Sequence, residues 1–181
     1  MAKQFTSLDA KHQEFIAEQH LFFVATADEG GRINLSPKGG DALRVLSPTR
    51  LVWRNLTGSG NETAGHLARV NRMTAMWCSF EKRPLILRAY GQARTVHPRD
   101  EDWDELDGHF PPHIGARQVY DMSIEMVQTS CGYQVPFMAF ERDRDTLDKW
   151  ADDRGPHGIS AYWDERNRET IDGLPTGILP E

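Results

Sequence analysis

Residues 51–63 read LVWRNLTGSGNET, and this stretch carries the most information in the chain. An apolar, β-favouring run over residues 51–55 predicts a strand. The following Thr-Gly-Ser-Gly predicts a flexible loop, and residues 61–70 have the composition of a short helix. A loop that opens a helix exposes unpaired backbone N–H groups, and such groups can hold a phosphate without a lysine.

Side chains of the same stretch add neutral hydrogen-bond donors: Thr57, Ser59, Asn61 and Thr63. Arg54 is a possible ionic partner for a phosphate, although strand alternation can also send it to the opposite face. The alternative interpretation is that Ser59 or Asn61 simply caps the helix. The loop is neither a Walker loop, which needs a Lys after its second Gly, nor a G-x-G-x-x-G dinucleotide motif.

On both sides of this stretch the pattern is mainly β. Further strands are predicted at residues 21–27, 32–36, 42–46, 73–80, 85–96 and 118–129. Most adjacent strands are separated by turn residues, as in 28–31 (DEGG) and 47–50 (SPTR). Short antiparallel strands in sequence-adjacent hairpins close into a barrel more readily than they form a parallel sheet. The predicted fold class is therefore mainly β with flanking helices.

Helices are predicted at the two ends of the chain. Residues 8–19 form the first, with Ser7 as its N-cap, and a short surface helix is expected at residues 100–106. Residues 142–152 and 156–168 form the last two. The tail after them is irregular.

Bulk composition limits the function classes. The chain has 181 residues, a net charge of −6 and two cysteines, Cys78 and Cys131. This length fits one domain, and the acidic balance disfavours nucleic acid as a partner. No apolar run reaches the ~20 residues of a membrane span, and the N-terminus lacks a signal-peptide pattern, so we expect a cytoplasmic protein.

Metal and catalytic signals are weak. His109 and His113 are four residues apart, but Pro111 and Pro112 exclude the helix that would align them as ligands, so no metal site is expected. No spacing identifies a general acid or base, and the catalytic residues stay unknown.

Several motifs in the right order resemble the pyridoxamine 5'-phosphate oxidase-like family. These are FFVAT (22–26), NLSPKG (34–39), RNLTGSGNETAGHL (54–67), MWCSFEKRPLILRAYG (76–91) and SCGYQVP (130–136). Later segments, WAD, GISAYW and IDGLP, resemble one bacterial branch of it. The resemblance implies an antiparallel split β-barrel of the FMN-binding type, usually a homodimer with FMN in a groove between subunits. It divides the chain into an N-terminal helix (1–20), the barrel (21–136) and a C-terminal helical extension packed on the barrel (137–181).

The resemblance also implies cofactor-binding residues. The first FMN-contacting strand falls on residues 35–38, with Ser36 in it and Lys38 at the basic position. A cation beside the N1/C2 edge of a flavin stabilises its anionic reduced ring. A solvated lysine in a turn is the alternative. The phosphate loop falls on residues 55–63, which include Asn55. Trp77 lies in the strand beside the ring, and Tyr133 belongs to a loop that reaches the partner subunit's site.

Two departures from the family matter. Authentic pyridoxamine phosphate oxidases place an Arg-Lys pair where this chain has Glu62-Thr63, and a carboxylate beside a phosphate is unfavourable. They also end in a strand with an Arg-Leu-x-Pro motif, whereas this chain ends in helices and residues 172–176 (DGLPT). Production of pyridoxal phosphate is therefore not expected.

Three hypotheses follow. The first is an FMN-dependent oxidoreductase that acts on an unidentified small-molecule substrate. The second is a non-catalytic protein of the same fold that binds a flavin, a deazaflavin or haem. The third is a structural or interaction protein whose cofactor groove is empty.

Overall fold

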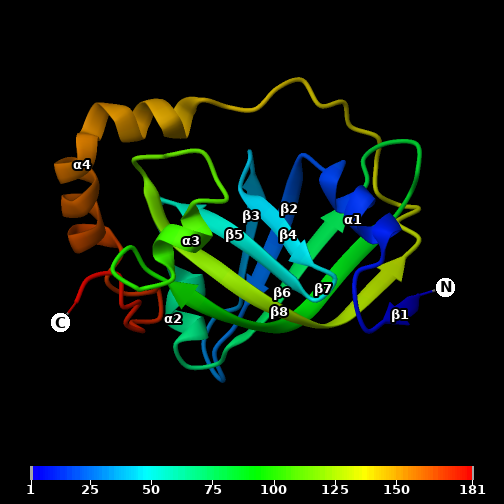
Figure 1. Ribbon diagram of the computed structural model, residues 1–181, viewed down its shortest axis with the longest axis horizontal. Coiled ribbons are helices and arrows are strands. Elements are labelled where there is room, and N and C mark those ends of the chain that lie inside the picture. Colours follow the sequence, from blue (N-terminus) through cyan, green and yellow to red (C-terminus); the bar gives the residue numbers. More distant parts are fainter. Residues whose placement is uncertain (1, 181) are drawn as a thin grey trace.

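A computed structural model describes residues 2–180, and its centre is one antiparallel sheet (Figure 1). The strands are β1 (Lys3–Phe5), β2 (Leu21–Thr26), β3 (Asn34–Gly39), β4 (Leu43–Ser47), β5 (Arg50–Leu56), β6 (Arg72–Cys78), β7 (Ile86–Val96) and β8 (Ala116–Ser130). Their order is β3-β2-β6-β7-β8-β5-β4, and β1 pairs with β8. The sheet curls, but its edge strands β3 and β4 do not pair with each other, so the barrel is split. The predicted fold class is confirmed.

The described residues also contain the helices α1 (Ala10–Ala17), α2 (Glu62–Leu67), α3 (Trp103–Asp107) and α4 (Thr146–Arg166). The N-cap of α1 is Asp9 and not the predicted Ser7, because Asp9 and His12 form a reciprocal capping box. The two predicted C-terminal helices are joined into α4 across a kink at Gly155, where φ is 64° and Pro156 follows.

Two strand predictions need correction at the edges. β1 was not predicted, because its three residues of mixed polarity give no periodic signal and pair only with the distant β8. The predicted strand at 32–36 is shifted to Asn34–Gly39 and includes Pro37. A proline is tolerated there because β3 is an edge strand, with one side free of ladder hydrogen bonds.

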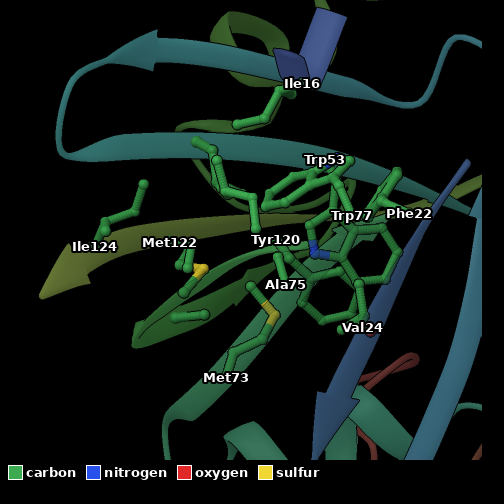
Figure 2. Close-up of a cluster of buried hydrophobic side chains, with 14 of the residues drawn as sticks. Ile16, Phe22, Val24, Trp53, Met73, Ala75, Trp77, Tyr120, Met122 and Ile124 are labelled. Atoms are coloured by element: carbon green, nitrogen blue, oxygen red, sulfur yellow. The ribbon is translucent and has the colours of Figure 1, made fainter. Parts of the chain in front are cut away.

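Alternation along the strands places the main core inside the curl. Phe22, Val24, Trp53, Trp77 and Tyr120 are at most 4% exposed and pack together (Figure 2). The rings of Trp53 and Tyr120 are stacked at 4.4 Å between centroids. A smaller cluster of Val52, Val96, Leu106, Phe110 and Val119 lies on the other face of β5 and β8. Each face of β5 therefore contacts a different environment, which decides where its polar residues point.

The C-terminal part leaves the sheet and returns to it. After β8 the chain crosses the top of the view as an extended, largely exposed segment and enters α4 on the left (Figure 1). The stretch after α4 is partly buried again: Asn167, Thr170, Thr176 and Ile178 are at most 6% exposed. This second burial brings the end of the chain against the loop that follows β5.

Candidate functional site

A polar cluster begins on the inner face of β3. In the register of β2 and β3, Asn34, Ser36 and Lys38 pair with Thr26, Val24 and Phe22, whose side chains point inward. Lys38 Nζ lies 3.3 Å from Asn55 Oδ1 and 5.1 Å from the centroid of the Trp53 ring. The structure thus brings together three of the residues predicted for the cofactor, namely Ser36, Lys38 and Asn55.

β8 extends this cluster with a residue that the sequence analysis missed. Gln118 is fully buried, and its Oε1 accepts hydrogen bonds from Asn55 Nδ2 at 3.2 Å and from the Tyr120 hydroxyl at 3.4 Å. The indole nitrogen of Trp53 and the amide nitrogen of Gln118 are buried without a hydrogen-bond partner in the structure. The sequence signal that could have identified Gln118 is strand alternation. Gln118 lies on the same inward face of β8 as Tyr120 and Met122, where a polar side chain is unusual.

Within residues 2–180, no carboxylate forms a hydrogen bond with the Lys38 ammonium. Its pKa is lowered from 10.5 to about 8, first because burial disfavours the charged ammonium and then because the Arg117 guanidinium repels it. A half-buried lysine with such a pKa differs from a solvated lysine in a turn.

The donors predicted to hold a phosphate are bonded to the chain itself. The Thr57 hydroxyl donates to Gly115 O at 2.9 Å and accepts from Trp163 Nε1 at 2.8 Å. Asn61 Nδ2 donates to Asn167 O at 3.2 Å. Neither side chain caps α2. Gly115 and Trp163 thus engage the Thr57 hydroxyl, and Asn167 engages the Asn61 amide, while a contact of either side chain with a phosphate stays a prediction.

Thr63 and Ser59, the other two predicted donors, lie differently. Thr63 is buried, and its Oγ1 accepts from Asn34 Nδ2 at 3.2 Å, which links α2 to the polar cluster on β3. Ser59 is exposed at the tip of the loop. Glu62 turns toward the C-terminal segment, where its Oε2 accepts from the Ile171 backbone N–H at 3.0 Å.

Arg54 does not join the cluster. It lies on the opposite face of β5 from Asn55, where its Nη1 donates to Pro111 O at 2.5 Å and lies 3.6 Å from Asp107 Oδ1. Strand alternation explains the separation, since neighbours on a strand point to opposite faces. Of the two faces that the sequence left open for Arg54, the structure shows the one opposite Asn55, so Arg54 does not lie with Asn55 as a partner for a phosphate.

Trp77 and Tyr133, the last two residues predicted for the cofactor, differ in burial. Trp77 is 1% exposed in the core and lines a hollow of about 440 Å³ between α1 and β4. Tyr133 is 77% exposed in the loop after β8. A larger groove of about 1050 Å³ lies near the start of β2, bounded by Cys78–Arg83 and by residues 137–140.

Arg117 and Asn167 are two further buried polar residues that the sequence analysis did not single out. Both contact the loop after β5: Arg117 Nη1 and Nη2 donate to Gly58 O and Gly60 O, and Asn167 Nδ2 donates to Gly58 O. Asn167 Oδ1 accepts from Arg117 at 2.8 Å. No local pattern marks these residues, since the sites they join are far apart in the chain.

Among residues 2–180, the structure shows neither a candidate metal site nor a helix suited to cross a membrane. No three His, Cys, Asp or Glu side chains within residues 2–180 lie together so as to hold a metal ion. None of the helices in that range combines the length and the apolar character that a membrane crossing needs.

Comparison with known proteins identifies the family. Residues 8–131 match the family model of pyridoxamine 5'-phosphate oxidase. The chain is 34% identical over 192 residues to the pyridoxamine 5'-phosphate oxidase family protein ustO of Aspergillus flavus, an alignment that covers 94% of this chain and 76% of that protein. This relative is fungal, so the similarity is not confined to bacteria.

Solved structures share the fold. A single-residue variant of HupZ from Group A Streptococcus aligns with a TM-score of 0.52 at 18% identity, over 67% of this chain and 98% of that one. A candidate pyridoxamine 5'-phosphate oxidase of Lactobacillus delbrueckii aligns with a TM-score of 0.54 at 19% identity, over 68% and 94%. With the family model and the curated relative, these likenesses agree with the split sheet described above. The chain belongs to the pyridoxamine 5'-phosphate oxidase family.

Proposed function

We propose that this protein binds FMN beside β3 and β5 and acts as a flavin-dependent oxidoreductase on a small organic molecule. The observation that carries the proposal is Lys38, a half-buried cation whose nearest hydrogen-bond partner is the neutral Asn55 amide. A buried positive charge is costly unless an anionic or acceptor group compensates it. The N1/C2 edge of a flavin is such a group, and its charge becomes negative on reduction.

The half-buried Lys38 ammonium fits this edge as a cationic donor. The N–H groups of Trp53 and Gln118 lack an acceptor but are fully buried, so they belong to the layer beneath the site and not to its surface. When bound, the flavin supplies the hydride chemistry. The protein would hold the positive charge of Lys38 in place through Asn55, and Gln118 would orient Asn55 from behind. Such a pre-arranged second layer keeps the reacting edge of a cofactor in one electrostatic environment.

A non-catalytic carrier of the same fold is the second candidate. It is favoured by the phosphate loop, whose Thr57 and Asn61 side chains are bonded to the chain and whose Glu62 replaces a basic residue. Such a protein would bind a flavin, a deazaflavin or haem without turnover. This candidate would be favoured by a purified protein whose cofactor absorption bands stay unchanged with every tested pair of electron donor and substrate.

An FMN titration tests the proposed function. We expect absorption bands at roughly 370 and 450 nm in protein purified with flavin, and quenching of flavin fluorescence when FMN is added to the apoprotein. The control is the same titration with pyridoxal phosphate, which has a phosphate but no isoalloxazine ring. No spectral change with FMN at high micromolar concentration would reject FMN as the cofactor, and deazaflavin and haem would then be titrated.

We further propose that the protein is a homodimer formed through the outer face of the sheet. Two rows of side chains cross this face: Pro37, Phe23, Met76, Arg88 and Gln128, then Leu35, Ala25, Thr74, Tyr90 and Met126. They are half-buried or exposed, and most are uncharged. A second copy of the chain is the simplest cover, since a two-fold contact places the same apolar face on both sides.

Met76→Glu is expected to convert this dimer to a monomer, because it places two like charges in an apolar contact. Met76 is only half-buried in one chain, so the fold should tolerate the change. Sedimentation velocity at micromolar concentration measures the outcome, with Ala161→Glu on an exposed position of α4 as the control. A wild-type protein that sediments as a monomer would contradict the dimer.

A further inference from the structure

Three carbonyl groups of the loop after β5 point toward the same two buried side chains. Gly58 O accepts from Arg117 Nη1 at 3.2 Å and from Asn167 Nδ2 at 3.0 Å. Ser59 O lies 3.5 Å from Asn167 Nδ2, and Gly60 O accepts from Arg117 Nη2 at 3.0 Å. Asn167 is 0% exposed and Arg117 is 2% exposed, so this contact is an interior one.

Peptide geometry then fixes the direction of the loop amides. In a trans peptide unit, the C=O of one residue and the N–H of the next point in opposite directions. The described residues contain no cis peptide bond. Because the carbonyls of residues 58–60 point at Arg117 and Asn167, the N–H groups of Ser59, Gly60 and Asn61 point away from them. Ser59 and Gly60 are exposed, so their amides face the outside of the molecule, whereas Asn61 is 2% exposed.

We propose that Arg117 and Asn167 are positioning residues that turn the amides of Ser59 and Gly60 toward the phosphate of the bound cofactor. This inference rests on the proposed binding of FMN. Successive backbone N–H groups that point the same way form a concave site for an anion. The C-terminal segment is therefore part of the cofactor site, although its side chains need not touch the ligand.

The charge of Arg117 supports an anionic ligand at this loop. Its Nε is buried without a partner, and no carboxylate within residues 2–180 forms an ion pair with it. Glu62 is a carboxylate that acts on Arg117 without an ion pair, and it accepts a hydrogen bond from the Ile171 N–H. A guanidinium held against loop carbonyls by hydrogen bonds leaves a net positive charge directly behind the amides.

The anchoring of Asn167 explains how the segment keeps its place. Asn167 O accepts from the Thr176 hydroxyl and from Asn61 Nδ2, and Trp163 Nε1 donates to Thr57. Gly65 of α2 is also in close approach to this segment, since a Cβ there would lie 2.4 Å from Thr170 Cγ2. One contact thus holds the segment together internally, and three tie it to the loop and to α2.

Comparing the Kd for FMN with the Kd for riboflavin isolates the contribution of the phosphate to binding. Riboflavin has the same ring and ribityl chain but no phosphate. In Asn167→Ala we expect the Kd for FMN to rise about tenfold while the Kd for riboflavin changes less than about twofold, since two hydrogen bonds that orient the amides are lost. A merely structural role would weaken both ligands equally.

A second variant and a matched control complete the test. Arg117→Lys keeps the charge but replaces the two guanidinium nitrogens that bond the two carbonyls with a single ammonium nitrogen, and we expect about a fivefold rise in the FMN Kd alone. It also carries the test if Asn167→Ala does not fold. Arg168→Ala removes an exposed neighbour on the same segment and should change neither Kd.

Each outcome has one meaning. Wild-type protein that binds FMN and riboflavin equally, or variants that weaken both equally, would overturn the positioning role while leaving flavin binding intact. Wild-type protein that binds neither ligand would reject the proposed function itself.

Discussion

Lys38→Met is expected to weaken FMN binding by about ten- to hundredfold at pH 7. Lys38 supplies the positive charge of the polar cluster formed by Ser36 and Lys38 of β3 and Asn55 of β5. A hydrogen bond to a charged group contributes about 1.5–3 kcal/mol to binding. Methionine keeps the length and the apolar stem, so the packing against Trp53 is largely retained. Fluorescence titration of the apoprotein measures the change.

The pH dependence of FMN affinity gives a sharper signature of the same residue. In the folded protein without ligand, the pKa of Lys38 is about 8, below its ordinary 10.5. Below pH 8 the residue is charged and available to the flavin. As pH rises above 8, the free protein loses this proton and binding must restore it. The affinity should therefore be level from about pH 7 to 8 and fall up to about tenfold per unit above that.

Two variants separate the charge from other groups that titrate at alkaline pH. Lys38→Met should lower the affinity but remove its fall above pH 8, and Lys38→Arg should remove the fall because arginine stays charged. Equal pH profiles in wild type and Lys38→Met would show that another group controls the affinity. The stability of the apoprotein should move in the opposite direction, since deprotonation between pH 8 and 10.5 relieves the cost of a buried charge in the folded state.

Gly91→Ala is expected to produce the largest loss of stability, about 3 kcal/mol or more. Gly91 lies in β7 where the register with β8 shifts, and an added Cβ would lie 1.9 Å from the backbone oxygen of Ser123. A backbone atom of a central strand cannot move aside as a flexible side chain can. Because β7 and β8 form the longest pairing of the sheet, relief of the clash has to disturb their ladder.

Thermal or urea unfolding of the apoprotein measures this effect. A loss of that size corresponds to a fall in Tm of about 6–12 °C for a domain of this length. Gly30→Ala is the matched control, since a Cβ at Gly30 meets nothing within 4 Å. Unfolding midpoints that agree within about 1 °C for Gly91→Ala and wild type would mean that the bulge absorbs the methyl group, against our expectation.

The sequence by itself predicted the type of the sheet and the position of most of its strands. Alternation in β8 and the turns between adjacent strands depend on neighbouring residues, so they are readable without any tertiary information. The resemblance to the family, and not this local pattern, placed Lys38 and Asn55 together as candidates. The local pattern left Arg54 open between two faces, and it missed the three-residue β1, which has no pattern of its own.

Only the tertiary structure decided which polar groups meet. Asn61 and Asn167 are hydrogen-bonded across 106 residues, and Arg117 reaches Gly60 across 57. It also showed that the hydroxyl of Thr57 is bonded to the chain and that Gln118 supports Asn55. The physical reason is that periodicity records which face a side chain takes, whereas its hydrogen-bond partner depends on how distant segments pack. The loop carbonyls therefore accept hydrogen bonds from Arg117 of β8 and from Asn167 after α4, and no residue of the loop itself encodes these partners.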